Sequence, residues 1–124
     1  MSNLVHFAQK IYQQLTGIHE ESYLGVNTSE TIVYPYLTYT FDAEAIDPSS
    51  EGFYLDIDVF DRNASYGGIL TVETLLKKGL DKEKLLTEEA LFRFKYSGAT
   101  EVPTMDNELK RRNVRFYVKI DWRK

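Results

Sequence analysis

The sequence predicts an α+β fold in the order α-β-β-α-β-β, with a mainly antiparallel four-stranded sheet and two helices packed on one of its faces. Two segments repeat apolar residues at the spacing of an amphipathic helix, and four others alternate apolar and polar residues as a half-buried strand does. Because each predicted strand has only one apolar face, one layer of helices is enough to bury it. A chain of 124 residues is expected to form a single domain, residues 1–124.

The first predicted helix lies near the N-terminus. Its apolar residues recur at intervals of three and four, and Gly17 is expected to end it, because glycine readily adopts the left-handed conformation found at helix ends. The apolar positions are Leu4, Phe7, Ala8, Ile11, Tyr12 and Leu15. Residues 18–33 mix acidic, small and polar side chains without a sustained period, which predicts a connecting arm, although the stretch "SETIVY" could form a short strand of its own.

The next two alternating segments predict a hairpin. They cover residues 36–42 and 53–61, and residues 43–52 supply the turn-forming side chains of a long loop between them. The residues expected to face the core are Leu37, Tyr39, Phe41, Phe53, Leu55, Ile57 and Val59. The residues between them, including Asp56 and Asp58, are therefore expected on the solvent face.

The second half of the chain predicts a helix followed by another hairpin. The helix is expected over residues 66–78, with Gly79 as the left-handed residue after its end, and residues 80–90 could add a short helical turn. A long link over residues 97–112 separates the last two strands. Their core-facing residues are expected to be Ala90, Phe92, Phe94, Tyr96, Val114, Phe116, Val118, Ile120 and Trp122.

Composition excludes several classes of function. The chain has no cysteine, so disulfides, thiolate metal sites and cysteine nucleophiles are excluded. Its two histidines match no metal-ligand spacing, and its glycines match neither a phosphate loop nor a dinucleotide fingerprint. The first residues are expected to be neither a signal peptide nor a membrane span. A net charge of -4 argues against a sequence-independent grip on nucleic acid. We therefore expect no catalytic residue, no metal and no cofactor.

The acidic residues of the second predicted strand allow two interpretations. Asp56 and Asp58 share one face, and together with Asp42 they could hold magnesium or manganese, which would make the protein a metal-dependent nuclease. Alternatively they form ordinary cross-strand ion pairs with basic residues of neighbouring strands. The candidate partners are Arg93, Lys95, Arg115 and Lys119. The second interpretation is favoured, because charged strand faces are usually only solvated.

The most basic run of the chain lies at the start of the last strand. Lys110, Arg111 and Arg112, continued by Arg115, could bind phosphate or an acidic protein face. They could equally protect an exposed strand edge from unwanted pairing. Apolar residues in the predicted loops favour a role in assembly, because they are exposed unless they dock onto a partner. They are Ile46, Val102, Met105 and Leu109.

The arrangement of these segments resembles the tail terminator, or tail completion, proteins of long-tailed bacteriophages and prophages. The resemblance lies in the helix "LVHFAQKIYQQL", the strand entry "YPYLTYTF", the strand "LDIDVFDRNASY", the helix "ILTVETLLKKGL" and the closing strand "RFYVKIDW". It covers nearly the whole chain, and each motif is loose. The family closes its second strand with an aromatic residue and a polar or basic one, which correspond here to Phe60 and Arg62. The long arm over residues 18–33 departs from the family pattern.

The resemblance implies a structural virion-assembly protein without enzymatic activity. Such a subunit forms a homohexameric ring on the end of the finished tail tube, stops its polymerisation and joins it to the head connector protein. DNA passes through the ring without specific binding. The implied partners are other copies of the chain, the tail tube protein and the head connector protein. The implied location is the virion tail, and the host cytoplasm during assembly.

The expected subunit or partner contacts combine acidic, basic and exposed apolar residues. They are Asp56, Asp58, Arg62, Met105, Leu109, Lys110, Arg111, Arg112 and Arg115. The acids and the arginines are expected to form opposed patches, as a closed head-to-tail ring requires. A head-tail stopper and a tail tube subunit are alternative functions, since both build rings from small sheet-rich domains. The metal-dependent nuclease is the alternative from another class.

Overall fold

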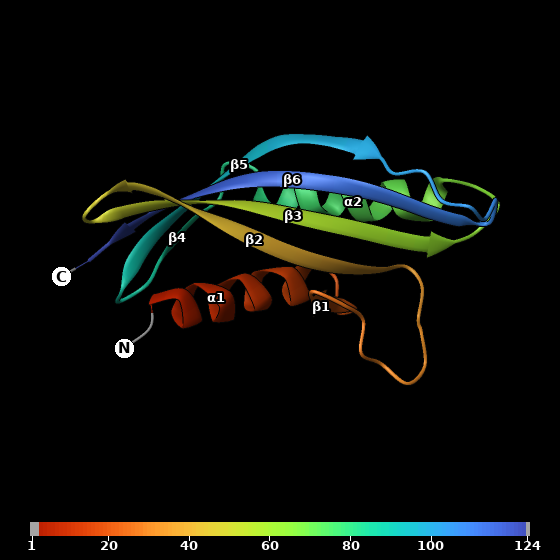
Figure 1. Cartoon of the computed structure of the whole chain (residues 1–124), viewed down its shortest axis with the longest axis horizontal. Helices are drawn as coiled ribbons and strands as arrows, with labels where there is room; N and C mark the ends of the chain where they lie inside the picture. Colours follow the sequence, from red (N-terminus) through yellow and green to blue (C-terminus); the bar gives the residue numbers. More distant parts are fainter. Residues whose placement is uncertain (1–2, 124) are drawn as a thin grey trace.

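A computed structural model describes residues 3–123, which form two helices and one sheet (Figure 1). The elements are α1 (Asn3–Ile18), β1 (Ser22–Leu24), β2 (Tyr36–Asp47), β3 (Ser50–Arg62), α2 (Gly67–Leu80), β4 (Lys84–Leu86), β5 (Ala90–Glu101) and β6 (Leu109–Trp122). Among these residues the sheet has six strands in the order β1-β2-β3-β6-β5-β4. The pair β1–β2 is parallel, and all other neighbouring pairs are antiparallel.

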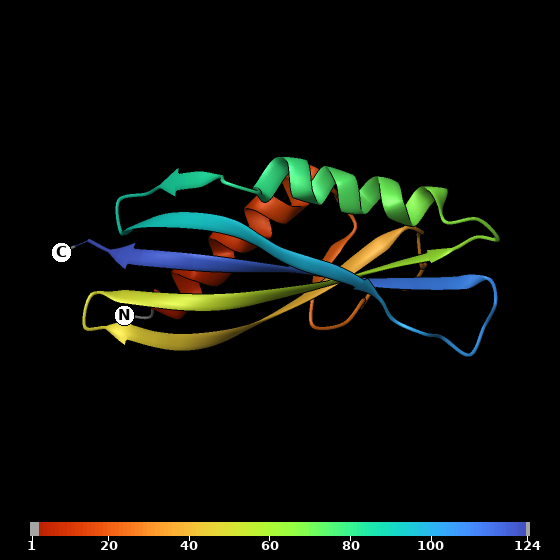
Figure 2. The same cartoon turned by 90° about the horizontal axis from the view of Figure 1, so that it is seen from above.

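The inner face of the sheet carries the core, and both helices pack on it, as predicted. The core-facing residues of β3 and β6 are fully buried, and they alternate with partly exposed or exposed ones. Phe7 of α1 stacks on Phe53 of β3 with ring centroids 3.9 Å apart. From α2, Ile69, Leu76 and two further apolar residues enter the same core. Figure 2 shows α1 passing obliquely behind the strands, while α2 runs along the β5 side.

The apolar stripe of α1 is narrower than predicted. Phe7, Ile11 and Leu15 are fully buried at intervals of four residues, whereas Leu4 and Tyr12 are half exposed, at 50% and 53%. The helix ends at Ile18, one residue beyond the predicted stop. Neither α1 nor α2 is long and apolar enough to cross a membrane, within the residues that the structure describes.

Six strands, where the sequence predicted four, result from two three-residue strands at the edges. β1 extends the sheet beside β2, where the Leu37 amide donates to the Glu21 carbonyl oxygen at 2.9 Å. The stretch "SETIVY", which the sequence left open as a further short strand, is irregular, and residues 80–90, where a short helical turn was an option, contain β4 instead. Three residues are too few to show a period, so these strands form through the edge to which they bind.

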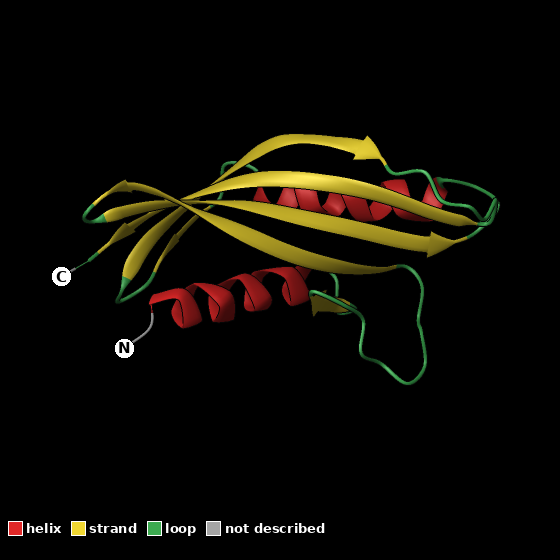
Figure 3. Cartoon of the chain, in the orientation of Figure 1, coloured by secondary structure: helices red, strands yellow, loops and turns green. Residues whose placement is uncertain are grey.

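Both predicted long loops are shorter in the structure. β2 and β3 continue to a turn at residues 48–49 (Figure 3), and β5 and β6 leave only residues 102–108 between them. The outer part of the β2–β3 hairpin extends beyond the helices, so it needs no apolar face and looks like a loop in the sequence. The ring of Tyr117 lies over Gly52 there, where a larger residue would collide with it.

Gly79 does not end α2 as predicted, because the helix continues to Leu80. A Cβ atom on Gly79 would lie 2.8 Å from Cδ1 of Ile18, so the absence of a side chain at Gly79 leaves room for the Ile18 side chain of α1. The left-handed conformation occurs at Lys82 instead, with φ of 64°.

Candidate interaction surfaces

The outer face of the two central strands is a network of charged and aromatic side chains. Arg115 of β6 pairs with Asp56 of β3, with Nε and Oδ1 3.2 Å apart. Arg111 pairs with Asp58, with Nη2 and Oδ2 3.3 Å apart, and the Asn113 amide donates to the same carboxylate at 3.4 Å. Strand pairing creates these contacts, because Arg115 lies directly opposite Asp56 and Arg111 lies one pair along from Asp58 on the same face.

Aromatic rings support both arginines of this network. The Arg115 guanidinium lies 4.8 Å from the centroid of the Tyr54 ring, and that of Arg111 lies 5.2 Å from the Phe60 ring. The Tyr54 ring meets that of Tyr117 edge to face, at 5.0 Å. Each guanidinium is thus bound by a carboxylate and an aromatic ring of its own subunit, so these charges are already paired within one subunit.

The network settles the position of the acidic and basic candidates. Asp56 has one of its predicted partners, Arg115, whereas Asp58 pairs with Arg111, which was not among the predicted partners. The acids and these arginines therefore lie in one patch, not in two opposed ones. The nuclease alternative required Asp42 to converge with both acids. Asp42 instead lies opposite Tyr54, and among residues 3–123 no group of three or more His, Cys, Asp or Glu side chains is placed to hold a metal ion.

Arg112 belongs to the inner face and not to this patch. It alternates with Arg111 and pairs with Glu73 of α2 through two hydrogen bonds, the longer of 3.4 Å from Nη2 to Oε2. The bond to Glu73 raises the pKa of the guanidinium above its usual value. β6 lies in the centre of the sheet, so the interpretation of the basic run as protection of a strand edge is wrong.

The remaining candidates gather at the end of the molecule where β5 turns into β6. Arg62 of β3 pairs with Asp106, with Nη1 and Oδ2 2.8 Å apart, and this bond holds the pKa of the Asp106 carboxyl below its usual value. The carboxylate also accepts the Glu108 amide at 2.9 Å. Met105, at the tip of the loop, is fully exposed. The loop is thus tied to β3 and presents one large apolar side chain to solvent.

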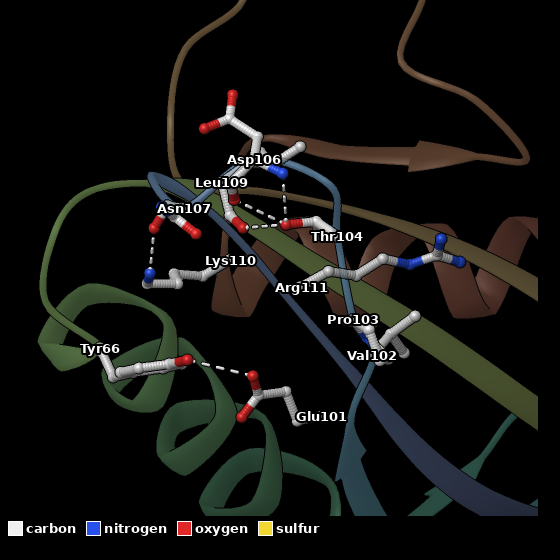
Figure 4. Close-up of a pocket in the computed structure, with 10 residues that line it drawn as sticks. All are labelled: Tyr66, Glu101, Val102, Pro103, Thr104, Asp106, Asn107, Leu109, Lys110 and Arg111. Atoms are coloured by element: carbon white, nitrogen blue, oxygen red, sulfur yellow. Dashed lines mark hydrogen bonds between the residues drawn. The ribbon is translucent and has the colours of Figure 1, made fainter.

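A pocket of about 230 Å³ lies behind this loop, beside the start of α2 (Figure 4). Lys110 Nζ lies 4.8 Å from the centroid of the Tyr66 ring, and the Tyr66 hydroxyl donates to Glu101 at 3.0 Å. Leu109 is half-buried at the pocket wall rather than exposed. Because Lys110 also donates to the Asn107 carbonyl oxygen, the polar groups of the pocket bind one another.

Charge is divided unevenly between the two halves of the sheet, a feature that the predicted site residues did not include. Residues 1–61 contain ten Asp and Glu but a single basic residue, Lys10, whereas residues 62–124 contain fourteen Lys and Arg against nine Asp and Glu. The first half of the sequence supplies β1, β2 and nearly all of β3, and the second half supplies β6, β5 and β4. One half of the sheet is therefore acidic and the other basic. A count of charges along the sequence would have found this signal.

Comparison with known proteins identifies the fold but no family. No protein-family model matches the chain, and no curated protein matches it either. Chains of solved structures do match, including one from the virion of a native gene transfer agent particle. The superposition covers 90% of this chain and 91% of that one, with a TM-score of 0.72 and 14% sequence identity. The two chains share a fold.

Proposed function

We propose that the chain is a structural virion-assembly protein that caps the tail tube of a long-tailed phage or prophage as a hexameric ring and joins it to the head connector. The observation that carries the proposal is the fold shared with a chain of a virion particle over nine-tenths of both molecules. It agrees with the resemblance of the sequence to phage tail terminator proteins. We propose that this chain, like the chain that shares its fold, is a component of a virion.

The physical demands of capping agree with the surfaces described above. A cap must present one fixed surface to the tube and another to the next component, and it needs no reacting group. The outer face around Arg111 and Arg115 and the loop tip with Met105 are suited to such contacts. A fully exposed methionine adapts to irregular apolar surfaces, so we assign Met105 and its neighbour Arg62 to the contact with the tube or the connector.

The net charge of the subunit suits a ring through which DNA moves. A protein of net charge -4 gains little from phosphate neutralisation, so DNA would pass without being held. The proposed location follows from the role, namely the virion tail, with assembly in the host cytoplasm.

The position of the protein on assembled tails tests this proposal. The chain, carrying a terminal affinity tag, is mixed with tail tubes assembled from the tube protein of the same genome, and the tag is located by immunogold electron microscopy. We expect gold at one end of each tube. Gold along the whole length would indicate a tail tube subunit, and gold on head connectors but never on tubes would indicate a head-tail stopper. Either result would reject the capping role.

A further inference from the structure

The free edge of β2 is the acidic side of the sheet. β1 pairs with β2 only at Leu37–Tyr39, and no described strand covers the rest of that edge. Residues 42–47 are all exposed, and Asp42 and Glu44 point from the outer face there. Asp42 has no ion pair or side-chain hydrogen bond among the described residues. Glu44 has only a hydrogen bond of 3.3 Å from the Tyr117 hydroxyl. This edge therefore carries negative charge that the subunit does not neutralise.

The opposite edge, formed by β4 and β5, carries a row of basic residues on its outer face, while Glu83 beside Lys84 is acidic. Lys84 lies directly opposite Arg93, which lies opposite Lys119, so three cations stand in one row across β4, β5 and β6. Like charges directly opposite each other destabilise a sheet. Asp121 offsets two of them, at 3.5 Å from Arg93 and 3.7 Å from Lys119, but Lys84 has no such partner among the described residues. Lys95, also exposed, has none either. A hollow of about 460 Å³ lies at this edge.

The strand register places the acids and the lysines on the same rows of the outer face. One row runs from Glu44 through Gly52, Lys119 and Arg93 to Lys84. The next runs from Asp42 through Tyr54 and Tyr117 to Lys95. Each row thus begins with an acid at one edge and ends with a lysine near the other.

Apolar side chains lie beside these rows at both edges. Leu86 of β4 is 66% exposed, and Ile46 at the irregular end of β2 is 43% exposed. The row that contains Leu86 continues through Leu91, Asp121 and Ser50 to Asp47, the neighbour of Ile46. If the β2 edge of one copy lay beside the β4 edge of a second copy with the rows aligned, Ile46 of the first would lie next to Leu86 of the second.

We propose that the acidic β2 edge of one copy binds the basic β4–β5 edge of the next copy, head to tail, with Asp42 and Glu44 facing Lys95 and Lys84. The inference rests on the proposed ring and names the two surfaces that close it. Contacts between unlike patches of identical subunits form a ring when the rotation closes. Charge complementarity fixes the direction and the register, because two acidic or two basic edges repel each other. Ile46 packs against Leu86 beside the ion pairs.

Site-specific cross-linking tests the contact without any tail component. The chain contains no cysteine, so single cysteines at Glu44→Cys and Lys84→Cys provide unique sites. The two variants are mixed at high concentration with a short bismaleimide and compared with a mixture of Glu108→Cys and Lys84→Cys, whose first site is exposed but lies at neither edge. We expect a mixed dimer of Glu44→Cys with Lys84→Cys several-fold above the control. Dimers of one variant with itself, or mixed dimers at the control level, would overturn the proposal.

Charge reversal tests the same contact in assembly. Asp42→Lys with Glu44→Lys makes both edges basic, and Lys84→Glu with Lys95→Glu makes both acidic. We expect each double variant alone to lose ring formation and tail completion, and the two expressed together to recover both by alternating around the ring. Full activity of either double variant alone, or no recovery in the mixture, would refute the edge contact. If the single-cysteine variants cross-link as expected but the wild-type chain never completes tails, the proposed function fails while the contact stands.

Discussion

The two faces of β3 and β6 are made by the same strands and differ in almost every physical property. On the inner face, residues such as Phe53 and Phe116 are fully buried in the hydrophobic core. On the outer face, Tyr54 and Arg115 alternate with them. There Arg115 pairs with Asp56 and lies over the Tyr54 ring, and both contacts are partly exposed to solvent. The comparison indicates that the inner face supplies the stability of the subunit, and that the outer face and its edges are free to serve assembly.

Truncation of adjacent residues on opposite faces gives the largest expected contrast. Phe53→Ala should lower the free energy of unfolding by about 3–5 kcal/mol, because it opens a cavity where Phe53 stacks on Phe7. Tyr54→Ala, one residue further, should cost no more than about 1 kcal/mol, since its ring is partly exposed. Urea denaturation followed by circular dichroism measures both. Equal losses in the two variants would contradict the division between the faces.

The ion pair of Arg112 with Glu73 should have an intermediate effect, because it lies on the inner face under α2. Its side chains are 21% and 17% exposed. Arg112→Met should lower the free energy of unfolding by about 1.5–3 kcal/mol, as expected when a largely desolvated charged hydrogen bond is broken. A double-mutant cycle with Glu73→Gln isolates the coupling, and a coupling near zero would show that the pair is not formed in solution.

The ion pair of Arg115 with Asp56 is the matched case on the outer face. Arg115→Met should change the free energy of unfolding by less than about 1 kcal/mol, because an exposed pair gains little over solvation. The effect should also shrink as salt is added, since salt screens exposed charges. Urea denaturation at low and high sodium chloride measures it. A loss as large as that of Arg112→Met would mean that the outer network also stabilises the fold.

The smallest expected effect concerns the pH dependence of the loop over residues 102–108. Arg62 lowers the pKa of Asp106 in the folded chain, so this contact stabilises the loop above the usual Asp pKa and is lost as the pH falls through the folded-state value. An NMR titration should place the Asp106 carboxyl below the usual range. Arg62→Gln should return it towards that range. The same titration curve in both proteins would exclude the contact.

The inner face could be predicted from the sequence because burial imposes a period. Every inward position of β3 and β6 follows from the alternation of side chains along the strand. The same alternation puts Arg112 on the inner face with Val114, and Arg111 on the outer face. The prediction that Arg112 belongs to one basic patch with Arg111 and Arg115 ignored this alternation. The pairing of Asp56 with Arg115 was among the predicted ones, whereas that of Asp58 with Arg111 needed the register, which no local pattern provides.

The edges could not be predicted in the same way. β1 and β4 have three residues each, and the outer part of β2 has no buried face, so neither leaves a periodic signal. Gly79 was interpreted from its position near a helix end, but its role is a contact with Ile18, a residue sixty-one positions earlier in the chain. Features that depend on distant partners are visible only once the strands and helices have been brought together.

Tail length in the absence and presence of the chain tests the central claim most directly. The claim is that the protein acts by fitting the end of a tube. Electron microscopy of particles from a genome that lacks the gene should show headless tails of uncontrolled length, and restoring the wild-type gene should return tails of one length joined to heads. Uniform, headed particles without the gene would contradict the account.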